Sequence, residues 1–391
     1  MRSGRRLLWI ISFHHACNDG TLMALVALLP ILLKQFDLTL YEVGLLGFGV
    51  LITVLVQYAI GRHADRAFSR YLLELGAVLM GLSFLLMLVV SNFEGLFLAV
   101  ISMRIGGAFY HPVGTSWITR EYAGPDLETA LGVQSGVGNF GVIIALATTG
   151  FLGDLYTWRA PCVLWAALNL SAVVLGVLLI KEEMVKTRVE PKKTASSPRL
   201  TLSKMMFLII PIVSGGAVYQ ITSTFGPINL TWKSAVWNPG SADFIFALWI
   251  GIGTATSYYF GALSARVGKY HLLRIGYLAS LVGAIILYVT TDWRLIAPTL
   301  FVFGAFLFVT YPALFSLITE LTGVEERGSA FGILFGFQLG GGAASVYLCG
   351  FIGDQLDSPH YSFLIAGVLA AAALIAITIW EAKIKELAKT C

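Results

Sequence analysis

Charged residues are scarce in this chain. Asp, Glu, Lys and Arg make up 12% of its 391 residues, whereas hydrophobic residues make up 57%. Soluble globular proteins carry about 25% charged residues, so this composition excludes an ordinary soluble domain. The mean hydropathy of +0.80 agrees with that conclusion. The sequence therefore predicts a protein that lies in a lipid bilayer.

Motifs of enzymes and nucleotide-driven machines are also missing. The chain contains no H-E-x-x-H, no G-x-S-x-G and no P-loop. Its four cysteines are scattered, with no C-x-x-C pair, so neither a disulfide framework nor a zinc site is predicted. We therefore expect no enzyme, no cofactor, no resident metal and no direct use of ATP.

Long apolar runs dominate what is present. Runs of about 20 residues can cross a hydrocarbon core of roughly 30 Å as helices. They do not alternate in hydrophobicity, which excludes a transmembrane β-barrel. The sequence predicts an all-α membrane protein with twelve transmembrane helices, near residues 7–30, 40–60, 71–91, 95–118, 128–151, 158–180, 204–229, 243–264, 272–290, 295–319, 328–351 and 361–381.

The N-terminal MRSGRRLLWI resembles the start of a secretory signal peptide. The apolar run that follows is interrupted by HH and ND, and no A-x-A-type cleavage site comes after it. Eleven further spans follow. We expect an uncleaved first helix rather than a removed leader.

The basic residues predict the orientation in the membrane. With both termini in the cytoplasm, the inner loops and tails hold 21 of the 26 Lys and Arg residues and the outer loops hold four. This excess follows the positive-inside rule. We expect a multi-pass protein of a bacterial inner membrane with both termini cytoplasmic. The net charge of +4 then reflects topology and contact with anionic lipid, and no nucleic-acid partner is expected.

The chain repeats itself at an offset of 200 residues. GFLGD at 150–154 recurs as GFIGD at 350–354, and Pro112 recurs as Pro312. Gly132, Gly136 and Gly141 recur as Gly332, Gly336 and Gly341. Such a repeat is typical of two parallel halves related by an axis along the membrane normal. We predict six-helix halves at 1–180 and 204–391, joined by a polar cytoplasmic linker at 181–203.

Ionisable side chains gather in the predicted first and fourth spans. A charged group at the bilayer centre costs on the order of 3 kcal/mol or more unless it is paired or hydrated. His15 and Asp19 are four residues apart and share a helix face. Asp19 and Arg104 lie at similar depths when counted at about 1.5 Å per residue. We predict that these two face each other, and that Asp19, His15 and Arg104 couple transport to protons, since His titrates near neutral pH.

Other polar and aromatic groups in the spans are candidates for lining a substrate cavity, although each is also a plausible packing residue. They are His14, Asn18, His111, Gln134, Asn139, Tyr219, Gln220, Tyr258, Tyr311 and Gln338.

The loop after the second span carries a family signature. GRHADRAFSR, at 61–70, resembles the G-x-L-A-D-R-x-G-R-R loop of the major facilitator superfamily, and GALSARVGKY at 261–270 is its weaker second copy. This resemblance covers the whole chain and implies two pseudo-symmetric six-helix halves working by alternating access. It also implies that the loop governs conformational exchange. The gating residues implied by this match are Gly61, Asp65, Arg66, Arg70, Gly261 and Arg266.

Within that superfamily, residues 10–155 most resemble the fosmidomycin-resistance family of efflux proteins. The stretches NDG at 18–20, FYHPVGTSWI at 109–118 and QSGVGNFG at 134–141 carry this similarity. The sequence departs from the resembled patterns at two places. Ala145-Leu146 stands where antiporters of the superfamily usually carry Gly-Pro, and Val113 follows Pro112 where the resembled family has Glu.

The leading hypothesis is a monomeric, proton-coupled secondary transporter that exports a drug-like or small polar compound. Because the Gly-Pro pair is absent, import of a small anionic metabolite, with Arg104 on its carboxylate or phosphate, stays open as the alternative. Three further hypotheses remain: a transported metal ion held by the histidines and Asp19, an intramembrane enzyme built on the same residues, and a receptor of this fold that moves nothing.

Overall fold

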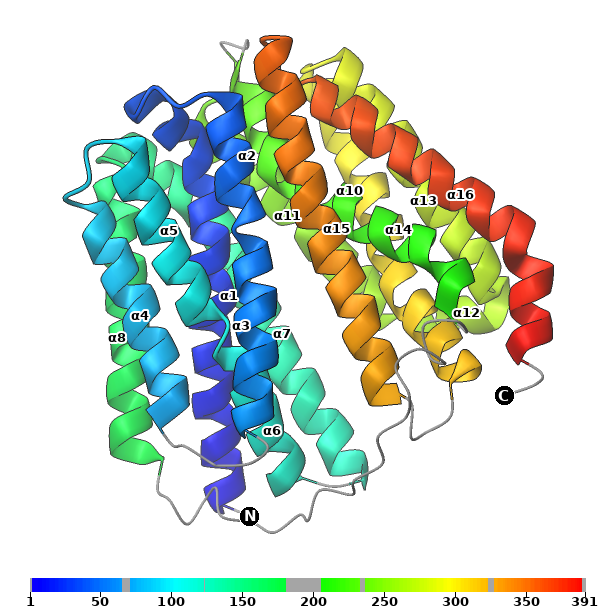
Figure 1. Ribbon diagram of the computed structural model, residues 1–391, viewed down its shortest axis with the longest axis horizontal. Coiled ribbons are helices and arrows are strands. Elements are labelled where there is room, and N and C mark those ends of the chain that lie inside the picture. The colour runs from blue at the N-terminus through cyan, green and yellow to red at the C-terminus, as the bar shows by residue number, and fades with distance from the viewer. Residues whose placement is uncertain are drawn as a thin grey trace. The chain divides into compact units, whose positions relative to one another are not determined.

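The structure is a computed structural model, and it describes residues 2–64, 71–122, 124–180, 205–232, 236–322 and 327–388. These residues are helical apart from short connections, and no strand occurs among them (Figure 1). The sequence prediction of an all-α protein is confirmed. Ten described helices are long and apolar enough to cross a membrane by length and composition, and Tyr71–Met87 is a shorter apolar helix.

The elements follow one another along the chain in two series. The first comprises α1 (Arg2–Gln35), α2 (Leu40–Phe48), α3 (Val50–Ala64), α4 (Tyr71–Met87), α5 (Phe93–Gly107), α6 (Tyr110–Glu121), α7 (Gly124–Leu155) and α8 (Arg159–Leu179). The second comprises η2 (Met206–Leu208), α10 (Ile209–Trp232), α11 (Pro239–Tyr258), α12 (Phe260–Val267), α13 (Lys269–Val289), α14 (Trp293–Leu321), α15 (Arg327–Gln355) and α16 (Tyr361–Ala388).

Each of the twelve predicted spans falls on one helix or on two consecutive ones. The span predicted at 95–118 is divided into α5 and α6 by a turn at Ala108 and Phe109. Pro112 lies in the first turn of α6, where its missing N–H is tolerated, and it could not bond to the carbonyl of Ala108 in a continuous helix. The two glycines before the turn, at 106 and 107, favour the same break. His111 is therefore set on a new helix that begins beside it.

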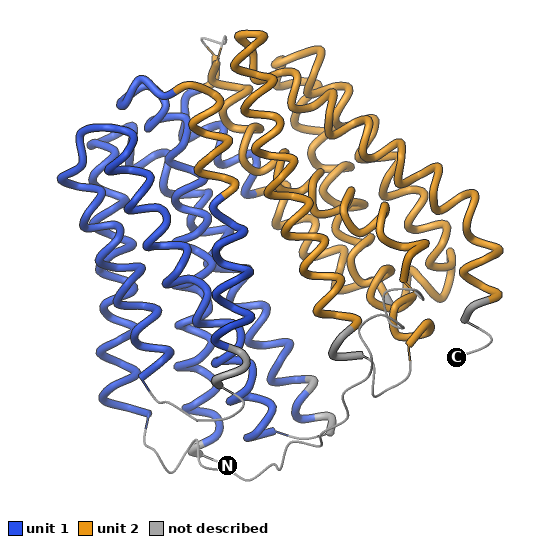
Figure 2. Tube along the Cα trace, in the orientation of Figure 1, with its two compact units in different colours: residues 1–38, 49–192, 238–247 blue, residues 39–48, 193–237, 248–391 orange. Residues whose placement is uncertain are grey.

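Contacts divide the chain into two compact units, coloured separately in Figure 2. Unit 1 comprises residues 1–38, 49–192 and 238–247, and unit 2 comprises residues 39–48, 193–237 and 248–391. The first turns of α11 thus pack within unit 1, and those of α2 pack within unit 2. The predicted linker at 181–203 lies outside the described residues, so the proposed boundary between halves stays a prediction.

Helix α1 is the central element of unit 1 and packs very closely on α7. A Cβ added to Gly141 of α7 would lie 2.3 Å from the carbonyl oxygen of Ala16, so the two backbones touch. Gly20 similarly makes room for the ring of Trp165 on α8. Below this crossing, a core of Leu7, Ile11 and neighbouring apolar residues packs against α6 and α7. Small residues at such crossings are typical of helices packed in membranes.

Candidate functional site

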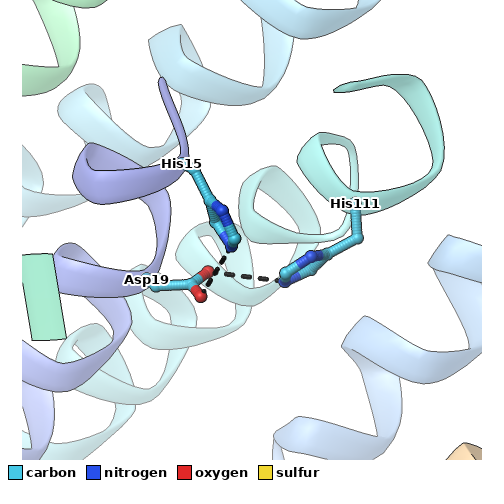
Figure 3. Close-up of side chains that lie close together, drawn as sticks. All are labelled: His15, Asp19 and His111. Atoms are coloured by element: carbon cyan, nitrogen blue, oxygen red, sulfur yellow. Dashed lines mark ion pairs between the residues drawn. The ribbon is translucent and has the colours of Figure 1, made fainter. Parts of the chain in front are cut away.

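Helix α1 presents two ionisable groups from successive turns toward a third on α6. Asp19 Oδ2 lies 3.0 Å from His15 Nε2, and Asp19 Oδ1 lies 3.4 Å from His111 Nε2 (Figure 3). The spacing of four residues puts His15 and Asp19 on one helix face, as predicted. His111 reaches the same carboxylate from the start of α6. We call these three residues the Asp19 cluster.

The Asp19 cluster is buried at one end and open at the other. The side chain of His15 is 8% exposed, that of Asp19 is 22% exposed and that of His111 is 44% exposed. Exposure thus increases from α1 toward α6. A proton or a substrate group can reach Asp19 from the His111 side, whereas His15 is shielded.

The ring of His15 is held in a defined orientation by α6 and α7. Its Nδ1 lies 2.9 Å from the backbone oxygen of Gln134, and the ring stacks on Tyr110 with centroids 4.5 Å apart. The Gln134 side chain in turn donates to the Tyr110 hydroxyl at 2.8 Å. A Cβ on Gly138 would lie 2.5 Å from ring atoms of His15, so only glycine leaves space there. The QSGVGNFG stretch is therefore the surface on which His15 rests.

These contacts determine where the protons lie. A carbonyl oxygen only accepts hydrogen bonds, so His15 Nδ1 carries a hydrogen and donates it to Gln134. A neutral His15 then has a bare lone pair at Nε2, which faces a carboxylate oxygen at 3.0 Å. Two acceptors at that distance repel each other unless a proton lies between them. The geometry therefore brings a histidine nitrogen and a carboxylate oxygen close enough to share one proton.

Asn18 completes the surroundings of the carboxylate. Its Nδ2 donates to Asp19 Oδ1 at 2.9 Å, on the oxygen that also faces His111. The donor stabilises negative charge on Oδ1 and leaves Oδ2 to share the proton with His15. Asn18 thus supports the cluster directly, a placement that its adjacency to Asp19 in the sequence does not reveal.

The predicted pairing of Asp19 with Arg104 is not seen as a direct contact and stays a prediction. Among the described residues no ion pair joins the two, and the positions around the carboxylate are taken by the two histidines. Arg104 lies buried in the last turn of α5, and its Nε has no hydrogen-bond partner.

His14 lies on a different side of α1 from the Asp19 cluster. Both His14 Nε2 and Glu74 Oε1 of α4 border the Cα of Gly176, at 3.1 and 2.7 Å from where a Cβ would stand. His14 and Asn18 also line a small internal cavity, together with Tyr110 and Asn169. Glu74 escaped the sequence analysis because it is only four residues into its span and looked like a helix-end charge. Its near-complete burial is a tertiary property.

The candidates in the second half belong to unit 2, and two of the five bond to the backbone there. Tyr311 donates to the carbonyl of Gly215 at 3.3 Å, and Gln220 donates to that of Leu339 at 3.4 Å. Tyr219 stacks on Trp249, with centroids 5.7 Å apart. The remaining candidates show no such bond in the structure: Gln338 is buried, Asn139 of α7 is half-buried, and Tyr258 is 85% exposed.

An aromatic group that the sequence analysis missed surrounds Tyr219. Trp249, fully buried on α11, contacts Phe303 and Phe308 of α14, and Phe308 contacts Tyr311. A single tryptophan within an apolar span gives no signal of its own in a sequence. These rings form one aromatic cluster within unit 2.

Three of the six predicted gating residues, Asp65, Arg66 and Arg70, lie outside the described residues. Gly61 and Gly261 lie within α3 and α12, and Arg266 is exposed in the last turn of α12. Their gating role stays a prediction.

The Asp19 cluster is also the place in the described chain where three donor atoms come within 4.8 Å of one another, near enough to share one metal ion. A proton and a metal ion can be told apart at such a cluster, because a proton is released on titration and a metal ion is removed by a chelator.

Substituting the glycine under His15 tests whether the orientation of that ring matters. Gly138→Ala would push the ring by about 1 Å, since the new Cβ overlaps it, and misplacement of this size can reduce activity about 10-fold or more. Gly136→Ala, two residues away with nothing within 4 Å of its Cβ, is the matched control. Transport rates in vesicles are the measurement. Equal rates in both variants would show that the orientation of His15 is unimportant.

Comparison with known proteins gives a consistent result. The family model described as Major Facilitator Superfamily matches residues 8–236 and 230–389. The uncharacterized MFS-type transporter YfnC of Bacillus subtilis is 25% identical over 295 residues, covering 72% of this chain and 70% of that protein. The fosmidomycin resistance protein of Escherichia coli is 22% identical over 364 residues, covering 90% and 88%.

Solved transporters share the fold at low sequence identity. A crystal structure of the nucleoside transporter NupG aligns with a TM-score of 0.78 and 16% identity, covering 98% of this chain and 99% of that one. A peptide transporter of the POT type in complex with sulfate gives 0.80 and 13%, covering 98% and 95%. These likenesses concern the fold.

Proposed function

The chain belongs to the major facilitator superfamily and is a transporter rather than an enzyme, and we propose that it couples transport of a small molecule to protons at the Asp19 cluster. The observation behind this proposal is the His15–Asp19 contact. The contact of His15 Nδ1 with the Gln134 carbonyl and the 3.0 Å distance from Nε2 to Asp19 support one shared proton. A secondary transporter driven by protons needs such a group, positioned where a substrate can compete for it.

The proposed exchange conserves the charge of the site when the substrate is a cation. An ammonium group of the substrate binds Asp19 from the open side beside His111 and replaces the charge of one proton. The positive charge of the bound substrate lowers the affinity of the His15–Asp19 pair for the shared proton. The proton is then released on the side of His111, which is the more exposed side chain. Return of a proton to Asp19 displaces the substrate. One proton therefore moves opposite to one substrate, with the two sides served in turn by alternating access.

Export is the direction we propose. The relative that covers 90% of this chain is named a fosmidomycin resistance protein, and resistance through a transporter is achieved by export. The cargo would be a drug-like or small polar compound able to donate to a carboxylate. The protein would act in the inner membrane as a monomer with both termini in the cytoplasm, in agreement with its excess of inner Lys and Arg.

Release of protons on substrate binding tests this proposal. Purified protein in weakly buffered detergent is mixed with candidate compounds, and a pH indicator follows the solution. We expect about one proton released per substrate bound at a pH near the titration of the cluster, and none from Asp19→Asn. Asp37→Asn, the same chemical change on an exposed turn, is the control. Binding without a proton signal in the wild type would contradict coupling. A signal abolished by a chelator would indicate a metal ion instead.

Arg104 supports a second candidate function. A buried guanidinium whose Nε lacks a partner, and which forms no ion pair among the described residues, is suited to an anionic ligand. Import of a small carboxylate or phosphate with a proton would use it. The same experiment separates the two functions, because a symporter takes up a proton on binding substrate and an antiporter releases one.

A further inference from the structure

A second buried acid lies at the far end of unit 1 from the Asp19 cluster. Asp243, in the first turns of α11, has no exposed surface, and neither carboxylate oxygen has a hydrogen-bond partner. The sequence analysis passed over it because it is the first residue of a predicted span and looked like a helix-end charge. Nothing in the proposed exchange at Asp19 uses it.

Helix α7 packs closely against Asp243. A Cβ on Gly150 of α7 would lie 2.4 Å from Asp243 Oδ2 and 2.8 Å from the carbonyl of Pro239. One turn earlier on α11, Gly240 packs against the ring of Phe151. The backbone N–H of Gly240 also donates to Asp154 Oδ2 at 3.0 Å. The first turn of α11 therefore packs against the GFLGD motif at 150–154, and we call α11 seated when this contact is made.

The carboxyl group in this position must be neutral. An isolated carboxylate buried without a partner loses its hydration and gains nothing in exchange, so it takes up a proton instead. Among the described residues, the charged group acting on Asp243 is Asp154 of α7, which is also acidic. A second negative charge nearby strengthens the preference for the neutral form. No described cation faces the pair.

The internal repeat supplies a natural comparison within the same molecule. The second copy of the motif, GFIGD at 350–354 on α15, holds the first turns of α2 in the same manner, with Gly350 against Leu40 and Gly44. The residue of α2 that corresponds to Asp243 at the 200-residue offset is Val43, which is also fully buried. A valine therefore suffices for packing. The acid at 243 is not needed to build the contact, so it serves another purpose.

We propose that Asp243 is a second proton-binding site, loaded while the first turns of α11 are seated on the GFLGD motif of α7 and emptied when they separate. This inference rests on the alternating-access part of the proposed function and not on the Asp19 cluster. Residues 239–247 follow the central linker in the chain but pack on a helix that precedes it. The contact must therefore break when the two halves separate at this end. Water then reaches Asp243, which ionises.

The sign of the pH effect follows directly. The seated state holds one more proton than the separated state, so raising the pH favours separation. The ratio of separated to seated molecules is expected to rise by up to about tenfold per pH unit. The rise begins at the pH where the exposed carboxyl of the separated state ionises and ends at the pH where the buried carboxyl of the seated state would ionise. If the termini are cytoplasmic, this end faces outward, so acidity outside would hold that side closed.

Distances between spin labels on α7 and α11 test the proposal. Cysteines are placed at Leu155 and Phe244, which are 74% and 44% exposed. Cys391 is replaced by serine, while Cys17, Cys162 and Cys349 are buried. Labelled full-length protein in lipid nanodiscs is measured by double electron–electron resonance from about pH 5 to about pH 8. We expect a long-distance population that grows with pH in the wild type and is small at every pH in Asp243→Asn and Asp243→Val.

Two further variants make the result decisive. The pH response should persist in Asp19→Asn, which separates this site from the one proposed for coupling. Val43→Asp, labelled instead at Phe48 and Leu356, should create a new pH response between α2 and α15. Persistence of the wild-type response in both Asp243 variants would overturn the proposal. If those variants fail to fold, a Val43→Asp protein with no pH response would overturn it as well.

Discussion

Proton-driven accumulation of substrate is expected to fall from about 100-fold to about onefold when Asp19 is replaced by asparagine. With about two pH units across the membrane, one coupled proton sustains a gradient of about 100-fold, because each unit is worth about 1.4 kcal/mol. Asparagine keeps the size of the side chain but cannot share a proton with His15. Substrate then equilibrates without being driven. Vesicles loaded at one pH and diluted into another give the measurement.

Exchange of labelled for unlabelled substrate serves as the control for this prediction. Exchange without a gradient needs binding and alternating access but no net proton movement. Asparagine keeps one acceptor oxygen for the donor group of the substrate, so Asp19→Asn should retain exchange within about tenfold once the substrate concentration is raised to saturation. A variant that loses exchange even at saturating substrate has lost alternating access or folding. Full accumulation in Asp19→Asn would remove Asp19 from the mechanism.

The two histidines should differ in their effects on the same assay. His15 is shielded, and its Nδ1 is committed to the Gln134 carbonyl, so its Nε2 is the atom that shares the proton. His111 is the more exposed and lies farther from the carboxylate, at 3.4 Å. His15→Gln should therefore reduce accumulation more than His111→Gln. The reverse order would mean that the proton is held at His111.

The sequence was sufficient to predict the helices, because hydrophobic length alone decides which segments cross a bilayer. It also predicted the pairing of His15 with Asp19, since a spacing of four residues defines one face of a helix regardless of tertiary structure. The GFxGD repeat was visible in the same way. The two copies of the motif pack against the first turns of α11 and α2. These contacts join residues more than eighty positions apart in the chain, so spacing in the sequence could not predict them.

Depth along a helix does not determine which way a buried side chain points or what covers it. Arg104 and Asp19 have matching predicted depths, but the groups in ion-pair contact with Asp19 are the two histidines. Glu74 and Asp243 lie near helix ends, where charges are usually solvated. Both are buried here because neighbouring helices cover them. Such coverage is a property of packing, and local sequence does not encode it.

The close crossing of α1 and α7 gives the largest expected effect on stability. Gly141→Ala is expected to lower the free energy of unfolding by about 3 kcal/mol, at the upper end of the range for overpacking. The new Cβ would lie 2.3 Å from the Ala16 carbonyl and 2.7 Å from its Cα. A helix backbone cannot rotate away as a side chain can, so the two helices must separate. That separation would also move His15, which is the residue before Ala16.

The internal repeat again supplies the control. Gly341 is the counterpart of Gly141 in the second half, but its Cβ would meet the side chain of Val213, at 2.7 Å. A side chain can shift to another rotamer, so Gly341→Ala should cost about 1 kcal/mol, the lower end of the same range. Thermal unfolding in detergent compares the two variants, with the larger loss in melting temperature expected for Gly141→Ala. Equal losses would mean that moving α1 away from α7 costs no more free energy than a rotamer change of Val213. The Asp19 cluster would then rest on a flexible support rather than on a fixed one.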